Sequence, residues 1–216
     1  MDVENEKRIA AEAAAELVED GMLVGLGTGS TVAFLLPALA SRGLDLRCVA
    51  TSVATEQTAA ELGMRVEPFA GVEALPRLDI AIDGADQVAP DGWLVKGGGA
   101  AHTREKAVAA AAKRFVVIVS SDKLVERLAQ PIPLELLEFG LAATLNRLAT
   151  VRLRDVPHSP DGGVIADYTG DVDDPSVLAA RLSATVGVVE HGLFPPELVS
   201  EIVIGREGEV ERISLT

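Results

Sequence analysis

VGLGTGST, residues 24–31, joins a short apolar run to a helix-like run through a glycine-rich turn, which is the signature of an α/β unit. The apolar residues before the turn predict a buried strand. The residues after it predict a helix that begins near Ser30 or Thr31 and ends before Gly43. Ligands of open α/β sheets bind outside the carboxyl ends of the strands, so this turn is a candidate binding loop.

The alternation of strand and helix continues on both sides of the turn. A helix is predicted over residues 4–19, ahead of it. Beyond it the pattern predicts strands at 46–52, 78–86, 93–99 and 114–123, with helices at 54–64 and 101–114. Such alternation predicts an α/β fold with a doubly wound, mainly parallel sheet of Rossmann-like type.

The regular alternation of strands and helices ends at residues 130–133, which read QPIP. The following segments predict the order strand, helix, strand, strand, helix, strand, which is the ferredoxin-like arrangement. We therefore expect a second, smaller ferredoxin-like α+β domain over residues 130–198. Residues 1–129 plus 199–216 would form the Rossmann-like catalytic domain, with 199–215 returning to it as a hairpin.

Composition and charge exclude several classes of function. The 216 residues carry a formal net charge of −14, which disfavours a nucleic-acid surface because such a surface needs clustered Lys and Arg. No apolar run reaches the roughly 20 residues that span a bilayer, so we expect a cytoplasmic protein that does not enter a membrane. With a single cysteine, Cys48, and no cluster of Cys and His, the sequence predicts no metal site.

The glycine-rich turn matches neither common nucleotide-binding fingerprint. Ser30 stands where a dinucleotide-binding turn needs its third glycine, and no lysine precedes the Ser-Thr pair as in a P-loop. The next strand ends in Thr51-Ser52, so the acidic partner of an adenosine ribose is missing. The turn can instead hold one phosphate through backbone amides and the hydroxyls of Thr28, Ser30 and Thr31. A plain strand-to-helix turn with Ser as N-cap is the alternative.

Two carboxylates end the strand at residues 78–86. Asp83 and Asp86 bracket Gly84 and Ala85, whose small size lets a ligand approach the backbone. The two carboxylates could hold sugar hydroxyls or move protons between neighbouring oxygens. The alternative is an Asx-turn that only ends the strand.

The segment 96–106, KGGGAAHTREK, carries the most chemistry. Three successive glycines are costly in conformational entropy, and a close contact between backbone and ligand explains them. Lys96 can supply positive charge to an anionic ligand, as can Lys123 in the later SSDK run. Glu105 is expected in the first turn of the next helix, where it would be a catalytic base or only a partner of the helix dipole. His102 is expected at the surface or in a loop.

Four segments in this order, GLGTGST, DGAD, KGGGAA followed by TREK, and SSDK, resemble the A type of ribose-5-phosphate isomerase. The resemblance covers nearly the whole chain, and the PIPLELL and GVVEHGLF segments are similar to the family's small domain. It implies an aldose-ketose isomerase of the non-oxidative pentose phosphate pathway. The implied reaction interconverts D-ribose 5-phosphate and D-ribulose 5-phosphate by ring opening and a cis-enediolate, without metal or organic cofactor.

The resemblance also implies roles for individual residues. Glu105 would move the proton between carbon 2 and carbon 1, and Asp83 would assist ring opening. Lys96 and the adjoining glycine amides would stabilise the enediolate. The implied substrate-binding residues are Lys7, Thr28, Gly29, Ser30, Thr31, Asp83, Gly84, Ala85, Asp86, Lys96, Gly97, Gly98, Gly99 and Lys123. A homodimer or homotetramer that takes a small pentose phosphate is implied as well.

Two segments depart from the family pattern, and two other functions compete. LEFG at 137–140 replaces a segment with a further proline, and SPDGG at 159–163 replaces a more usual Asn-containing turn. A non-catalytic regulatory module that binds sugar phosphates would have no need for Glu105 and would carry a DNA-binding segment. An amino-sugar phosphate deaminase would share the phosphate turn but need a histidine-bearing catalytic segment, which we do not find in the sequence.

Overall fold

The computed structural model describes residues 2–215, which form two compact units. The first unit holds the residues up to Ala85, Arg104–Leu124 and the residues from Pro196 onward. The second holds Asp86–Thr103 and Val125–Pro195. These units differ from the predicted domains chiefly in residues 86–103, which cluster with the smaller unit. The predicted domain boundaries themselves stay a prediction.

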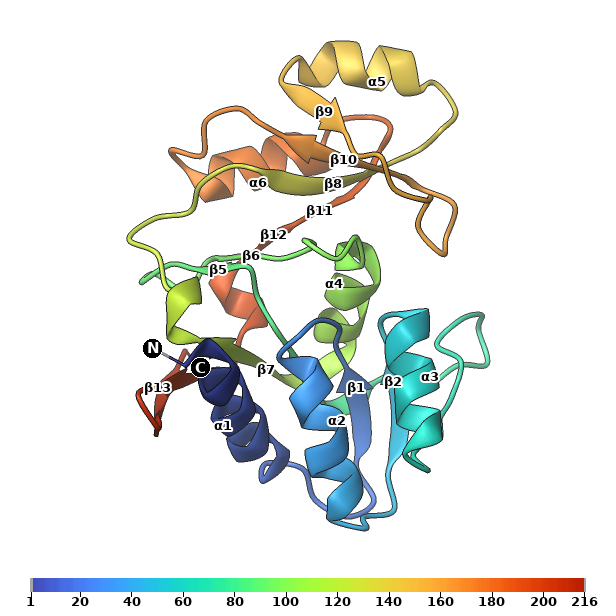
Figure 1. Ribbon diagram of the computed structural model, residues 1–216. Coiled ribbons are helices and arrows are strands. Elements are labelled where there is room, and N and C mark those ends of the chain that lie inside the picture. The colour runs from blue at the N-terminus through green and yellow to red at the C-terminus, as the bar shows by residue number, and fades with distance from the viewer. Residues whose placement is uncertain (1, 216) are drawn as a thin grey trace. The chain divides into compact units, whose positions relative to one another are not determined.

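A seven-stranded sheet forms the centre of the first unit (Figure 1). Neighbouring strands pair in parallel from β13 to β3, and β13 and β14 form an antiparallel hairpin. The predicted mainly parallel sheet and its returning hairpin are therefore confirmed. The order of strands is β14 (Glu209–Ser214), β13 (Glu201–Arg206), β7 (Ala112–Ser120), β4 (Leu78–Asp83), β1 (Leu23–Leu26), β2 (Arg47–Ala50), β3 (Arg65–Val66).

Three helices, α1 (Val3–Ala15), α2 (Val32–Ser41) and α3 (Val53–Glu61), cover one face of this sheet. Their apolar side chains share one core with alternate strand residues, as expected where successive side chains point to opposite faces. The helix predicted over 4–19 ends earlier, at Ala15. None of the helices in residues 2–215 has the length and hydropathy needed to cross a membrane.

Helix α4 (His102–Ala111) packs against the other face of β1. Val108 lies against Gly25, where the Cβ of any larger residue would overlap the valine side chain. The glycine at this position of the strand therefore lets helix and sheet approach closely. With helices on both faces, the arrangement is the doubly wound one that the sequence pattern predicts.

The second unit contains an antiparallel four-stranded sheet in the order β11 (Val188–His191), β8 (Ile132–Leu136), β10 (Val164–Tyr168), β9 (Val151–Leu153). Helix α5 (Leu141–Leu148) joins β8 to β9, and α6 (Pro175–Ser183) joins β10 to β11. The apolar sides of both helices share a core with the sheet. The chain order βαββαβ and this strand order confirm the ferredoxin-like prediction.

A three-stranded antiparallel sheet completes the second unit, in the order β12 (Leu193–Phe194), β6 (Leu94–Val95), β5 (Gln87–Val88). It corrects two predictions. The strand expected at 93–99 belongs to this sheet and not to the parallel one. The last strand of the ferredoxin-like order, which the GVVEHGLF segment (187–194) would form, is divided into β11 and β12. Strands of two residues are too short for an apolar periodicity to reveal their partners.

Candidate functional site

The carboxyl ends of four neighbouring parallel strands carry most of the candidate residues of the first unit. In the order β7, β4, β1, β2, these ends lead into Ser121–Lys123, Gly84, the Gly27–Thr31 turn and Thr51. The chain winds from β1 to β2 and β3 on one side, and places β4, β7 and β13 on the other side. The winding therefore reverses between β1 and β4, which is where open α/β sheets bind their ligands.

Asp83 and the glycine turn meet at this reversal point. The Oδ1 atom of Asp83 accepts hydrogen bonds from the amide of Thr28 at 2.9 Å and from that of Gly84 at 2.7 Å. Gly27 lies against the same carboxyl group, and a Cβ at this position would overlap it. The side chain of Asp83 is buried, so two backbone amides hold a carboxylate away from bulk water at the edge of the sheet.

The hydroxyl of Thr28 belongs to a cluster that the sequence analysis missed. It donates to Ser52 Oγ and lies 2.8 Å from Thr55 Oγ1, which in turn donates to the carbonyl of Gly27 at 2.8 Å. Ser52 also caps α3, accepting from the amide of Thr55 at 3.1 Å. A Ser directly before a helical run is an N-cap signal, so the TSVAT segment could have been identified. The cluster ties the glycine turn to the start of α3.

Two of the three remaining residues of the turn are exposed. Gly29, with φ +114°, and Ser30 are exposed, while Thr31 is buried at the start of α2. The side chain of Thr31 makes no capping hydrogen bond. The structure therefore does not show the alternative in which a hydroxyl of this turn serves only as a helix cap. The amides of the first turn of α2 point toward the same edge of the sheet as Asp83.

Glu105 and His102 both lie in the first turn of α4, and both are buried. The predicted position of Glu105 is confirmed, and its side chain is 4% exposed. The expectation of a surface position for His102 is wrong, because its exposure is 0%. Its ring fills the space beside Gly97, whose backbone has φ +104° and where a Cβ would lie 2.7 Å from Nδ1.

Lys7 and Lys123 lie on two different helices, which the buried carboxylate of Glu6 links together. Glu6 of α1 accepts from the amide of Ser121 at 2.9 Å and from its hydroxyl at 2.7 Å, at the start of the short helix η1 (Ser121–Lys123). These bonds from Ser121 hold the pKa of Glu6 below its usual value, although burial opposes them. Lys7 pairs with Glu4 at 2.6 Å, and Lys123 pairs with Asp122 at 3.1 Å.

The second unit holds the other candidate residues, Lys96, Asp86 and the glycine loop, which we define as Gly97–Gly99. Lys96 is buried, and its ammonium lies 5.5 Å from the centre of the Phe194 ring. The Oδ2 atom of Asp86 accepts from the amide of Gly98 at 2.7 Å. The structure thus brings Asp86, Lys96 and the glycine loop together within one unit.

Charged residues on the ferredoxin-like sheet, which the sequence analysis did not single out, also reach this region. Glu135 of β8 is buried and accepts hydrogen bonds from Thr103 and Ser159. Arg154 and Asp167 form an ion pair at 2.6 Å. The sequence does contain a signal: these charges interrupt strands that are otherwise apolar, and a buried charge needs partners.

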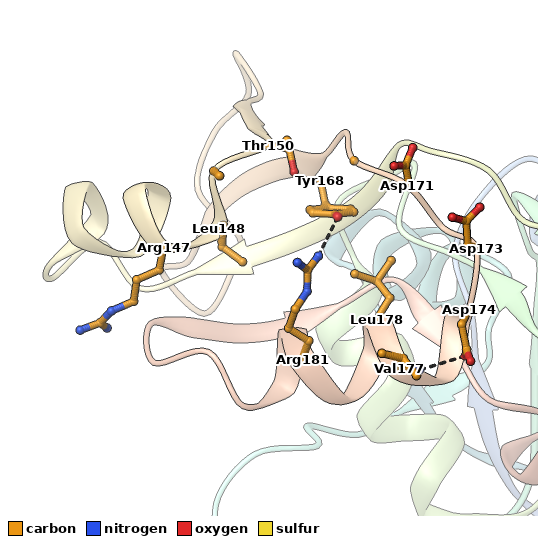
Figure 2. A pocket seen from close by; sticks show the side chains of 12 residues that line it. Arg147, Leu148, Thr150, Tyr168, Asp171, Asp173, Asp174, Val177, Leu178 and Arg181 are labelled. Carbon is orange, nitrogen blue, oxygen red and sulfur yellow. Dashed lines mark hydrogen bonds between the residues drawn. The ribbon is translucent and has the colours of Figure 1, made fainter.

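A separate pocket opens on the second unit, between the ends of α5 and α6 and strand β10, with a volume of about 590 Å³ (Figure 2). Arg181 lies over the ring of Tyr168 and donates to its hydroxyl at 2.6 Å. Asp174 on the same rim caps α6 through the amides of Ser176 and Val177. None of the predicted site residues lines this pocket.

Metal ligands do not gather anywhere in the part of the chain that the structure describes. No three side chains among His, Cys, Asp and Glu of residues 2–215 come together in a way that could hold an ion. Cys48 is buried in the core of the first unit, and burial raises the pKa of its thiol to about 12. A thiol in this state is a small apolar core group rather than a nucleophile or ligand.

Comparison with proteins of known sequence identifies relatives over almost the full length. A chain from Caulobacter vibrioides named ribose-5-phosphate isomerase A is 45% identical, and the alignment covers 99% of both chains. One of the same name from Methanosarcina acetivorans is 43% identical over 97% of this chain and 94% of its own.

Solved structures agree with these relatives. The ribose 5 phosphate isomerase A of Neisseria gonorrhoeae superposes with a TM-score of 0.90 at 33% identity, covering 97% of this chain and 96% of that one. A D-ribose-5-phosphate isomerase in complex with phospho-erythronic acid has a TM-score of 0.90 at 34% identity, covering 99% and 100%. The family model "Ribose 5-phosphate isomerase A (phosphoriboisomerase A)" matches residues 47–209. The chain therefore belongs to the ribose 5-phosphate isomerase A family, isomerases that interconvert ribose 5-phosphate and ribulose 5-phosphate.

Proposed function

We propose that Asp83, Glu105 and Lys96 carry out the isomerisation of D-ribose 5-phosphate in this chain, without a metal or an organic cofactor. The observation that carries the proposal is the carboxylate of Asp83, held by the amides of Thr28 and Gly84 beside a glycine turn at the reversal point of the sheet. A carboxylate fixed in this way is oriented for proton transfer before substrate arrives. The alternatives of a regulatory module or a deaminase are not favoured by the relatives.

The reaction begins with the opening of the sugar ring. Asp83 takes the proton of the hydroxyl on carbon 1, the bond from carbon 1 to the ring oxygen breaks, and Asp83 passes the proton to that oxygen. The product is the open aldehyde. Asp83 suits this step because its Oδ1 atom is oriented by backbone amides that cannot themselves titrate.

Proton transfer between the two carbons follows. Glu105 removes the proton from carbon 2, and the electron pair moves onto oxygen 1 to give the enediolate. The ammonium of Lys96 and amides of the glycine loop stabilise this negative charge. Glu105 then returns its proton to carbon 1 while the hydroxyl proton of oxygen 2 passes to oxygen 1. One carboxylate serves both steps because the two carbons are adjacent on one face of a cis-enediolate.

Substrate binding uses the phosphate as a handle. We assign it to the amides and hydroxyls of Gly29, Ser30 and Thr31 and to the charges of Lys7 and Lys123. Thr28, Gly84, Ala85 and Asp86 complete the sugar-binding surface. Phospho-erythronic acid, bound in a similar solved enzyme, has a carboxylate with two oxygens that can represent those of the enediolate. We propose that this chain binds it too.

A cytoplasmic location, which rests on the lack of an apolar run long enough to span a bilayer, and a homodimeric or homotetrameric assembly, which rests on the family resemblance, complete the proposal. Light scattering coupled to gel filtration measures the assembly, and a monomer at working concentration would contradict it.

The direct test of function is conversion of D-ribose 5-phosphate into its ketose by the purified protein after dialysis against EDTA. We expect full activity with the chelator present. Activity that disappears on dialysis and returns with one divalent ion would contradict a mechanism by side chains alone. No turnover of this substrate under any condition would remove the proposed function.

A further inference from the structure

The glycine loop depends on a backbone conformation that it cannot hold by itself. Gly97 has φ +104° and Ala100 has φ +60°, and the amide of Ala100 closes a tight turn onto the carbonyl of Gly97 at 3.0 Å. Gly98 is exposed, as is Gly99. Three successive glycines, two of them exposed, can adopt many backbone conformations, so other groups must select one of them.

Arg154 makes hydrogen bonds that select this conformation. Its Nη1 atom donates to the carbonyl of Gly97 at 2.9 Å and to that of Gly98 at 3.1 Å. Its Nε and Nη2 atoms donate to Oδ1 of Asp167 at 3.0 and 2.6 Å. The guanidinium thus bridges a buried carboxylate and two successive loop carbonyls, which the planar fork of arginine allows.

The backbone and the ion pair hold Arg154 itself in place. Its amide donates to the carbonyl of Ile165 at 3.0 Å, which extends the pairing of β9 with β10 by one residue. Side-chain exposure is 16% for Arg154 and 6% for Asp167, so water competes little for these bonds.

The geometry of the peptide bond makes the direction of each loop amide depend on the direction of the carbonyl before it. In a trans peptide the N–H of one residue points opposite to the C=O of the residue before it. With the carbonyl of Gly97 turned to Arg154, the amide of Gly98 points away and donates to Asp86 at 2.7 Å. The carbonyl of Gly98 also faces Arg154, so the amide of Gly99 points away from the guanidinium. A cation on the carbonyl also polarises that amide into a stronger donor.

We propose that Arg154, held by Asp167, is a positioning residue: it orients and polarises the amide of Gly99 for the negative charge of the enediolate, and it keeps the amide of Gly98 on Asp86. The inference rests on the proposed function, because it concerns the charge that develops at the same loop. Arg154 does not touch the reacting atoms itself. Its contribution grows as charge develops on the sugar, so it lowers the barrier more than it strengthens binding of the substrate.

The test compares Arg154→Lys with Arg152→Lys. Lysine keeps the charge at residue 154, but one ammonium cannot span Asp167 and both carbonyls. Arg152 is the matched control, because it lies on β9 two residues before Arg154, 3.5 Å from the other oxygen of Asp167, with a side chain that is 73% exposed. Asp167→Asn changes the other member of the ion pair with Arg154. Thermal melting checks that all three variants fold.

Two measurements follow. Steady-state kinetics should show kcat lowered about 10- to 100-fold in Arg154→Lys, with KM changed by less than about threefold, while Arg152→Lys stays near wild type. Affinity for phospho-erythronic acid should fall more than affinity for ribitol 5-phosphate, which lacks the carboxylate. Independently of activity, NMR with ¹⁵N-glycine should show faster amide exchange at Gly98 and Gly99 in Arg154→Lys, and Asp167→Asn should change in the same direction.

Three results would overturn the proposal. One is a folded Arg154→Lys with wild-type kcat, and another is an equal loss in Arg152→Lys. The third is unchanged exchange of the glycine amides in both Arg154→Lys and Asp167→Asn. If the wild-type protein does not isomerise ribose 5-phosphate, the proposed function fails, and the exchange measurement still decides whether Arg154 orders the loop.

Discussion

Gly27 packs directly against the carboxyl group of Asp83 at the edge of the parallel sheet. The carboxyl group lies where a side chain on residue 27 would be. Gly27 donates its amide to the carbonyl of Ile82 at 2.9 Å, while Asp83 accepts the amide of Thr28. Two successive amides of the turn after β1 thus donate to acceptors at the end of β4. The absence of a side chain at one residue allows the carboxylate of the other to be held there.

Gly27→Ala should damage this contact. The new methyl group overlaps the Asp83 carboxyl, so we expect a loss of about 1–3 kcal/mol in the free energy of unfolding, with kcat reduced as well. Urea denaturation measures the loss. Gly84→Ala is the stability control, because its nearest atom would be 3.8 Å from the new Cβ. Equal stability of Gly27→Ala and wild type would contradict the prediction, because it would mean that the edge of the sheet shifts to make room for the methyl group.

Glu105→Gln should separate catalysis from binding. Glutamine keeps the size and hydrogen bonding of the side chain but not its basicity, so kcat should fall by at least ~10²–10⁴ while substrate affinity is largely retained. Glu105→Asp withdraws the carboxylate by about 1 Å, which can cost ~10² in rate. Turnover is measured beside affinity for a non-reacting pentose phosphate. If folded Glu105→Gln turns over normally, the role of base passes to Asp83 or Asp86.

Lys123→Ala should weaken binding of the phosphate. Because the phosphate is a remote handle that positions the reacting carbons, we expect a higher KM with a smaller effect on kcat, and the same for Ser30→Ala and Thr31→Ala. Arg127→Ala, an exposed cation outside the proposed site, is the control for general loss of positive charge. Unchanged KM in Lys123→Ala, Ser30→Ala and Thr31→Ala together would remove the phosphate assignment.

Glu6 should make the stability of the first unit depend on pH in acid. Hydrogen bonds from Ser121 hold its pKa below 4.5 in the folded protein. Its ionised form therefore stabilises the fold above the unfolded-state pKa, and this stabilisation is lost as pH falls through the folded-state pKa.

Glu6→Gln should accordingly lose about 1–3 kcal/mol at pH 7 and show a weaker decline of Tm below pH 4.5. Glu12→Gln on the same helix, an exposed partner of Arg8, is the control and should change little. The measurement is Tm against pH by calorimetry. Parallel curves for wild type and Glu6→Gln would contradict the role of Glu6.

The candidate residues were predictable from local signals. Glycines in VGLGTGST and KGGGAA, and carboxylates at strand ends, indicate a ligand because such residues are costly or unusual in plain turns. Their assignment to catalysis stays a prediction. Burial was not predictable: Glu105 and His102 lie one turn apart on α4 and are both enclosed, although the helix has few large apolar residues. Burial depends on what packs around a helix, which its own sequence does not contain.

The fold class, the ferredoxin-like order after residues 130–133 and the family could all be predicted from the amino-acid sequence. These follow from apolar periodicity and from motifs in order along the chain, which are local properties. Three contacts became known from the folded chain alone: β6 pairs with β5 and β12, Gly27 adjoins Asp83, and Arg154 reaches the glycine loop. Such contacts join residues far apart in the chain, and they form because strand pairing and the pairing of buried charges are satisfied only when the whole unit is assembled.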